Sequence, residues 1–287
     1  MAEIEIRDVN YIYNKGTPYE VHALKNINLK IGGGITGIIG HTGSGKSTLV
    51  QLFNGLAKPT EGQVLIDGED IWEKSERVRR ARFRAGLVMQ YPEHQLFAST
   101  VYEDIAFGPR NMGLSEEEVN LRVMSAAEFA KIPEDVMNRS PFDLSGGQKR
   151  RVALAGVIAM NPEFLVLDEP AAGLDPGGRR FILGGIKEYR KKSGTSVVIV
   201  SHSMEDMASY CDRIIVMASG KVVMDGTCAE VFSRSHELIG IGLDVPQVTR
   251  IAAALSERGI DIGRDVYTVG YAAEQISARA FFEDKTK

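Results

Sequence analysis

The sequence predicts an α/β fold: a mixed, mostly parallel sheet with a helical subdomain inserted into it and a small α/β addition at the C-terminus. Three observations support this prediction. Short apolar segments alternate with helical patterns along most of the 287 residues, as is typical of parallel strands covered on both faces. Residues 91–146 lack this alternation and favour helices joined by loops. The pattern changes again after residue 232, which divides the chain into a main domain, 1–232, and a C-terminal module, 233–287.

The N-terminal half begins with strand patterns. Ile4 and Ile6 alternate with charged residues, which indicates a half-buried strand. In the inserted subdomain, Ser115 and Glu118 form a capping box that starts a helix towards Phe129. The other elements expected before residue 146 are strands at 24–31, 35–40, 63–66 and 86–90 and a helix at 46–56.

The α/β alternation returns after the subdomain. The Ser219-Gly220 pair lies between two short apolar segments, which predicts a hairpin turn. An apolar helical stripe begins at Pro246 and ends at Gly259. The other elements expected are helices at 147–160, 177–191, 204–211 and 272–281 and strands at 164–167, 195–200, 213–217 and 221–224.

Composition excludes several classes of protein. The net charge of −4 lacks the basic character of a duplex-binding protein, so no nucleic-acid partner is expected. No apolar run approaches the roughly 20 residues of a membrane span, so other chains must cross the bilayer if this one serves transport. Cys211 and Cys228 lack metal-ligand spacing and suit a reducing cytosol. The arginines crowded into residues 77–84 indicate either a solvated surface or a contact for anionic headgroups or an acidic partner.

A glycine-rich loop predicts phosphate binding. Gly40-His-Thr-Gly-Ser-Gly-Lys46-Ser47 matches G-x-x-x-x-G-K-[ST] between a predicted strand and a predicted helix. The glycines let backbone N–H groups surround phosphate oxygens, and the helix N-terminus adds a positive dipole end. Lys46 places a charge on the outer phosphates, and the Ser47 hydroxyl can ligate Mg²⁺. The predicted nucleotide-binding residues of this loop are Gly40, His41, Thr42, Gly43, Ser44, Gly45, Lys46, Ser47 and Thr48.

Two adjacent acids follow an apolar strand. Phe164–Leu167 carries Asp168 to the carboxyl edge of the sheet, beside the glycine-rich loop, and Glu169 comes next. Adjacent strand residues point in opposite directions, so the two acids are expected to have different roles. Asp168 can hold Mg²⁺ through water, as the acid at the end of this strand does in P-loop ATPases. Glu169 can orient and polarise the attacking water as a general base.

A second anion site is predicted at another helix start. In Leu144-Ser-Gly-Gly-Gln148, a serine and two glycines open a helix, so that Ser145, Gly146, Gly147 and Gln148 present a hydroxyl and free N–H groups at a positive dipole end. This stretch resembles the signature sequence of the ATP-binding-cassette (ABC) family, whose fold is a P-loop nucleotide-binding domain of the ABC type. The resemblance implies two subunits paired head to tail, each signature closing over the γ-phosphate held by the other subunit.

The resemblance also implies roles for residues that no local pattern would single out. Gln90 matches the glutamine that reaches Mg²⁺ and the attacking water, which completes a metal set of Ser47, Gln90 and Asp168. Asp175 closes a segment that crosses the dimer seam. His202 matches the histidine that contacts the γ-phosphate, and it joins Glu169 as the second catalytic residue. Tyr13 resembles the aromatic residue that stacks on adenine, with Tyr11 as the alternative. ATP and Mg²⁺ are the implied cofactors.

Several stretches are most similar to the ATPase subunits of energy-coupling factor (ECF) importers, and to the second of two paralogous subunits. They are 13–20, 90–97, 105–109, 140–142, 201–206 and 242–246. This likeness implies a peripheral protein on the cytoplasmic face of the cell membrane that powers uptake of vitamins or transition-metal ions. Its implied partners are a second ATPase subunit, as a heterodimer or a homodimer, a transmembrane scaffold and a membrane substrate-capture protein. The sequence does not identify the cargo, because the cargo meets other chains.

Other interpretations stay open. A subunit of a conventional ABC importer or exporter differs from the first interpretation only in the stretches above, and a soluble ATP-dependent switch is a further alternative. A nucleic-acid motor is disfavoured by the acidic balance and by the lack of a coiled coil between the two motifs. Ala171 departs from the threonine or serine usual in the family. The module 233–287 is expected to serve dimerisation or regulation.

Overall fold

A six-stranded sheet lies at the centre of the computed structural model, which describes residues 2–260, 262–263 and 266–283. Its order is β10-β9-β3-β8-β7-β6, and the five strands from β9 to β6 run parallel to one another, whereas β10 is antiparallel. The mostly parallel sheet that the sequence predicts is therefore confirmed. The strands are β3 (Ile35–Gly40), β6 (Ala85–Val88), β7 (Phe164–Asp168), β8 (Ser196–Val200), β9 (Arg213–Ala218) and β10 (Lys221–Thr227).

The sheet separates two hydrophobic cores. Alternate residues of β7 belong to different cores: Leu165 and Leu167 pack with the helices on one face, and Phe164 and Val166 pack on the other. This follows from the period-two alternation of strand side chains. Because β3, β7 and β8 are covered on both faces, they are buried along their whole length.

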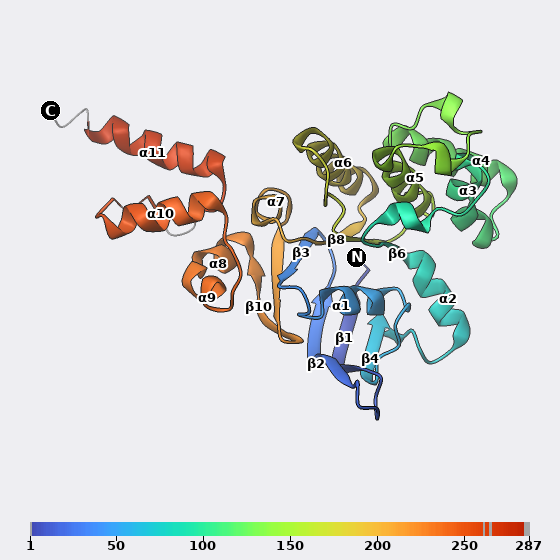
Figure 1. The fold of residues 1–287 in the computed structure, drawn as a ribbon, viewed down its shortest axis with the longest axis horizontal. Helices are drawn as coiled ribbons and strands as arrows, with labels where there is room; N and C mark the ends of the chain where they lie inside the picture. The colour runs from blue at the N-terminus through green and yellow to red at the C-terminus, as the bar shows by residue number, and fades with distance from the viewer. Residues whose placement is uncertain (1, 261, 264–265, 284–287) are drawn as a thin grey trace.

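A four-stranded antiparallel sheet, in the order β2-β1-β4-β5, covers the second core (Figure 1). Helix α1 (Lys46–Phe53) packs with it through Leu49, Leu52 and Phe53, each fully buried. The N-terminus of α1 is thereby fixed at the end of β3, where the glycine-rich loop lies. The strands are β1 (Ile4–Tyr13), β2 (Val21–Ile31), β4 (Glu61–Ile66) and β5 (Glu69–Asp70).

The inserted subdomain is helical, as expected. The predicted capping box is present, because Ser115 Oγ accepts from Glu118 N, and the Glu118 carboxylate accepts from Ser115 N. The elements are the short 3₁₀ turns η1 (Pro92–Gln95), η2 (Glu134–Val136) and η3 (Pro141–Asp143) and the helices α3 (Val101–Asn111), α4 (Glu116–Phe129) and α5 (Gly146–Ile158).

The C-terminal addition differs from its prediction. Among the described residues after β10 the only regular elements are helices, so the expected α/β character is wrong for this part of the chain. Leu238, Leu243 and Val245 join the main core, and a separate small cluster around Val248 and Val266 follows. In Figure 1, α10 and α11 lie side by side, away from the central sheet. The helices of this part are α8 (Cys228–Ser233), α9 (Ser235–Gly240), α10 (Gln247–Glu257) and α11 (Val269–Glu283). The remaining helices of the main domain, α6 (Pro176–Ser193) and α7 (Met204–Tyr210), precede β9 in the chain.

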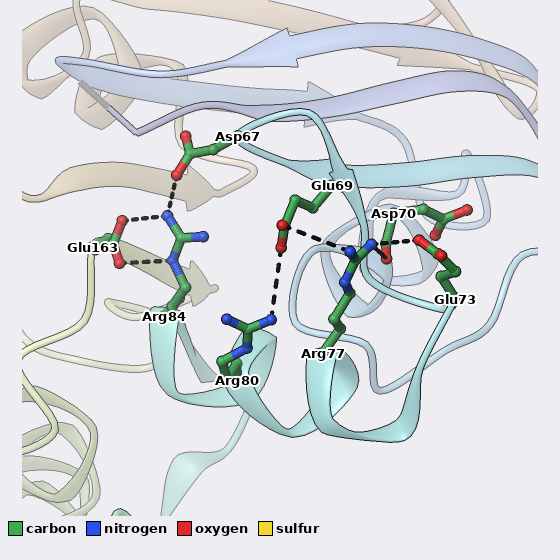
Figure 2. Close-up of polar contacts among 8 residues, drawn as sticks. All are labelled: Asp67, Glu69, Asp70, Glu73, Arg77, Arg80, Arg84 and Glu163. Atoms are coloured by element: carbon green, nitrogen blue, oxygen red, sulfur yellow. Dashed lines mark hydrogen bonds and ion pairs between the residues drawn. The ribbon is translucent and has the colours of Figure 1, made fainter.

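The arginine-rich stretch forms helix α2 (Ser75–Arg84), which the sequence analysis did not predict. Figure 2 shows that three of its arginines, Arg77, Arg80 and Arg84, turn towards acids of the same chain. Arg84 pairs with Glu163 through bonds of 2.7 and 2.6 Å and also with Asp67. Arg77 contacts Glu69 and Glu73, and Arg80 contacts Glu69. Intramolecular ion pairs thus occupy three of the arginines for which an external acidic partner was considered.

Candidate nucleotide-binding and hydrolysis site

The glycine-rich loop lines one side of a cavity of about 440 Å³ at the carboxyl ends of β3 and β7. Gly45 has a φ of +100°, and a Cβ at this position would lie 2.7 Å from the carbonyl oxygen of Ala23, so only glycine fits there. Lys46 Nζ is folded over the loop and donates to the carbonyl oxygens of Gly40 (2.7 Å) and His41 (2.9 Å). The loop therefore directs backbone N–H groups and a buried ammonium group towards the space where phosphates are expected.

Most of the predicted site residues from different elements meet in this cavity. Gly40, His41 and Ser44 belong to the glycine-rich loop but do not line the cavity. Sequence reasoning missed the part of the wall that β2 and the β9–β10 turn supply, because no motif marks it. Those missed residues are Val21, His22, Ala23, Lys25, Ser219 and Gly220. The predicted residues that line the cavity are Tyr13, Thr42, Gly43, Gly45, Lys46, Ser47, Thr48, Gln90, Asp168, Glu169 and His202.

The two candidate aromatic residues differ in position. Tyr13 lines the cavity, its side chain is exposed, and its hydroxyl lies 3.0 Å from the Thr48 hydroxyl. Tyr11 packs against the core beneath the antiparallel sheet and meets Tyr13 edge-on, with ring centroids 4.8 Å apart. The geometry therefore favours Tyr13 as the residue that stacks on a base.

Glu169 sits in a strained backbone conformation. Its φ is +53°, a region that residues other than glycine rarely adopt and that is found preferentially at functional sites. Its Oε1 lies 3.2 Å from His202 Nε2, but outside hydrogen-bond geometry, so this buried atom has no hydrogen-bond partner among the described residues. A buried acceptor of this kind is available to a water molecule that enters with the nucleotide.

Burial changes the protonation of this group. It raises the pKa of Glu169 to about 7, with the neighbouring charge of Asp168 as the second cause. Burial also lowers the pKa of His202, and the nearby Lys46 charge acts in the same direction. The pKa of Glu169 thus lies near neutral pH, as that of a general base should, and His202 is favoured in its neutral form.

The three proposed metal ligands offer only oxygen donors, which fits Mg²⁺. Burial raises the pKa of Asp168, and a hydrogen bond with Ser47 opposes this effect, so the two side chains are adjacent. Gln90 follows β6 and lines the same cavity. The residues present therefore fit a Mg²⁺ ion that arrives with the nucleotide.

The signature residues lie apart from this cavity, at the start of α5. Ser145 Oγ accepts from Gln148 N at 3.3 Å, and the Gln148 side chain accepts from Ser145 N at 2.9 Å. The Ser145 hydroxyl hydrogen stays available to an anion, because capping uses the oxygen as an acceptor. Gly146 and Gly147 border open space. A second cavity of about 530 Å³ lies there, with Asp175, which caps α6 by accepting from Gly178 N, on its other side.

We expect kcat/KM for ATP to fall as the pH drops through about 7, the pKa to which burial raises Glu169. Only the ionised carboxylate can accept a proton from water, so the active fraction is full above this pKa and declines below it. Initial rates at low ATP concentration, measured across the neutral pH range, give this acidic limb of the pH–rate profile. The limb should vanish in the residual activity of Glu169→Gln; if it persists, another group is responsible for it.

Comparisons with known proteins agree with this geometry. The ABC transporter family model matches residues 24–172. The energy-coupling factor transporter ATP-binding proteins EcfA2 of Caldanaerobacter subterraneus and Clostridium perfringens are 53% and 50% identical, and each alignment covers 95% of this chain and 96% of the relative. CbiO1 of Clostridium perfringens, described as part of the ABC transporter complex CbiONQ, superposes with a TM-score of 0.73 at 38% identity, covering 88% of this chain and 98% of that one.

A second solved structure bears on the site. The dimeric ATP-binding cassette MJ0796, with ADP and Pi bound after hydrolysis, gives a TM-score of 0.70 at 30% identity and covers 78% of this chain and 98% of its own. The fold and the site thus define an ATP-hydrolysing cassette of an ABC transporter. Within that class, the chain belongs to the family of energy-coupling factor transporter ATP-binding proteins. No helix in the described ranges is long and apolar enough to span a membrane.

Proposed function

We propose that this chain is the second ATPase subunit of an energy-coupling factor importer, bound to the cytoplasmic face of the membrane. It pairs with another ATPase subunit beneath a transmembrane scaffold and a substrate-capture protein, and it powers uptake of vitamins or transition-metal ions. The proposal rests on the family membership and on one structural observation, the division of the nucleotide site into two half-sites on one chain.

The half-sites have complementary chemistry and share no lining residue. One offers the glycine-rich loop, Lys46 and Glu169, and the other offers the helix start at Ser145 and the carboxylate of Asp175. Both need negative charge to balance their N–H groups. A nucleotide held between the loop of one subunit and the signature of another satisfies both half-sites, which supports the head-to-tail dimer. A conventional importer or exporter would use the same pair, so the membrane partners distinguish these alternatives.

Within the closed site, each side chain has a separate task. Lys46 and the loop N–H groups hold the outer phosphates, and Tyr13 supports the base. Mg²⁺ held by Ser47, Gln90 and, through water, Asp168 would neutralise charge on the phosphates. Glu169 orients the attacking water and accepts its proton. His202, whose Nε2 lies 3.2 Å from Glu169 Oε1, contacts the γ-phosphate. Positioning and electrostatic stabilisation supply most of such catalysis.

We assign docking of the membrane scaffold to a cavity of about 280 Å³ formed by α2, α3, α5 and the loop after η1. Phe97 and Phe107 stand exposed at this groove, with ring centroids 4.7 Å apart. The buried carboxylate of Asp104 accepts from the backbone N–H groups of Phe97 (3.1 Å) and Ala98 (3.2 Å), which fixes the loop. A pair of exposed aromatic rings beside a groove, one of them on a loop fixed by hydrogen bonds, is typical of a protein interface.

Phe97→Asp is expected to release the chain from membranes in cells that express the partner subunits, because it places a charge in the apolar groove. A central aromatic contact contributes roughly 2 kcal/mol or more, so the bound fraction should fall by at least about tenfold. Fractionation with immunodetection measures this loss, and nucleotide binding should be unchanged. Leu121→Asp is the control, because Leu121 on α4 is exposed to a similar extent but lies outside the groove. Equal release by both variants would contradict the assignment.

A further inference from the structure

Arg150 lines the cavity at the signature residues, but the nucleotide and scaffold proposals give its buried charge no role. It lies on α5, just after the signature residues, and only 8% of its surface is exposed. A guanidinium group stays protonated in proteins, so burial has to be compensated by nearby acceptors. The groups that compensate Arg150, a carbonyl oxygen and a carboxylate, come from two other segments of the chain.

The first acceptor belongs to the turn between Glu169 and Asp175. Arg150 Nη1 donates to the carbonyl oxygen of Ala172 at 2.5 Å. Ala172 N in turn donates to the carbonyl oxygen of Glu169 at 3.2 Å. The guanidinium therefore holds the backbone that sets the strained conformation of Glu169 and leads to Asp175, the residue that caps α6.

The second contact is an ion pair with the segment after Gln90. Arg150 Nη2 lies 3.7 Å from Glu93 Oε2, a buried atom that has no hydrogen bond among the described residues. Glu93 is part of η1, and Tyr91, between Gln90 and this turn, has a φ of +57°. The position of Gln90 in the cavity is thus linked through a short, strained segment to the same guanidinium.

We propose that Arg150 is a positioning residue that couples the signature helix of this subunit to the hydrolytic groups of its own nucleotide site. When α5 closes over a nucleotide held by the partner subunit, its guanidinium moves with it. That movement reaches the Glu169 turn through Ala172 and the Gln90 segment through Glu93. Closure at one nucleotide site therefore changes the positions of Glu169 and Gln90 at the other. This inference rests on the proposed function, because it requires the head-to-tail dimer.

A purely structural role makes a different prediction. Removing Arg150 leaves the Glu93 carboxylate partly buried without its counter-charge, which destabilises a fold whatever the function. Replacing both residues by neutral ones of similar size relieves that penalty. Stability should then return, whereas the link between α5 and the hydrolytic groups stays broken.

The test uses the complex assembled with its partner ATPase and membrane subunits, and compares Arg150→Met with the double variant Arg150→Met/Glu93→Gln. We expect Arg150→Met to lower the melting temperature and the second substitution to restore it. In the double variant, kcat should stay roughly 10- to 100-fold below wild type, as expected for misplaced catalytic groups. KM for ATP should change by less than about twofold, because the contacts of this guanidinium in the described chain are with Ala172 and Glu93.

Arg122→Met is the matched control, because Arg122 also donates to a backbone carbonyl oxygen, that of Met160, but lies on α4 away from both half-sites. A double variant with wild-type kcat, or a kcat that recovers together with the melting temperature, would overturn the inference. If the double variant does not fold, Arg150→Lys is the deciding variant. Lysine keeps the charge but lacks the two separate N–H groups that contact Ala172 and Glu93, so wild-type turnover of this variant would overturn the coupling. Failure of Glu169→Gln to trap a dimer with ATP would refute the proposed function instead.

Discussion

Glu169→Gln is expected to retain ATP binding and to lose hydrolysis by a factor of roughly 10² to 10⁴, the usual contribution of a general base. The amide keeps the size of the side chain but cannot accept a proton from water. Oε1 of Glu169 is buried beside His202 without a hydrogen-bond partner in the described part of the chain, so the substitution breaks no hydrogen bond of this atom. Because the nucleotide is not consumed, the closed dimer should accumulate with ATP.

Single-turnover hydrolysis and gel filtration of the assembled complex with ATP measure these two effects. Glu188→Gln is the control, because Glu188 is an exposed glutamate on α6 that pairs only with a nearby lysine among the described residues. Near-normal turnover by the Glu169 variant would refute the role of this carboxylate. A variant that binds ATP yet stays monomeric would contradict the shared nucleotide site.

The nucleotide site was predictable because its chemistry is local. The loop from Gly40 to Ser47 carries its own glycines, lysine and hydroxyl group, and the apolar strand before Asp168 determines where that acid lies. The tertiary fold is still needed to bring these segments together at one sheet edge. The lining role of Lys25 depends on how β2 packs beside the loop, which no local pattern reveals.

Helix α2 shows a second limit of sequence reasoning. Its only buried residue is Ala81, so it lacks the apolar stripe by which helices are recognised. Its residues are instead held by acids distant in sequence, such as Glu163 for Arg84. Arg150 is also held by groups far from it along the chain, the carbonyl oxygen of Ala172 and the carboxylate of Glu93. Long-range polar contacts leave no periodic signal, and neither does the left-handed conformation of Glu169.

Lys46→Ala is expected to weaken binding of ATP by roughly 10- to 100-fold, because a hydrogen bond to a charged group contributes roughly 1.5–3 kcal/mol. Lys46 is buried, and two of its three N–H groups donate to the carbonyl oxygens of Gly40 and His41. Among its contacts in the described chain, this leaves the third N–H for a phosphate oxygen. The alanine variant loses both the phosphate contact and the bonds that hold the loop closed.

Calorimetric titration with Mg²⁺ and a non-hydrolysable ATP analogue measures the loss. Lys46→Arg sharpens the test, because the guanidinium keeps the charge but replaces a compact ammonium group, which bonds both carbonyl oxygens, by a larger planar group. If charge alone mattered, arginine would restore affinity; if the fit of the ammonium group to the loop matters, both variants should bind weakly. Lys192→Ala, in the exposed last turn of α6, should bind as wild type does. Affinity within about twofold of wild type for Lys46→Ala would mean that the loop's backbone N–H groups hold the phosphates without this side chain.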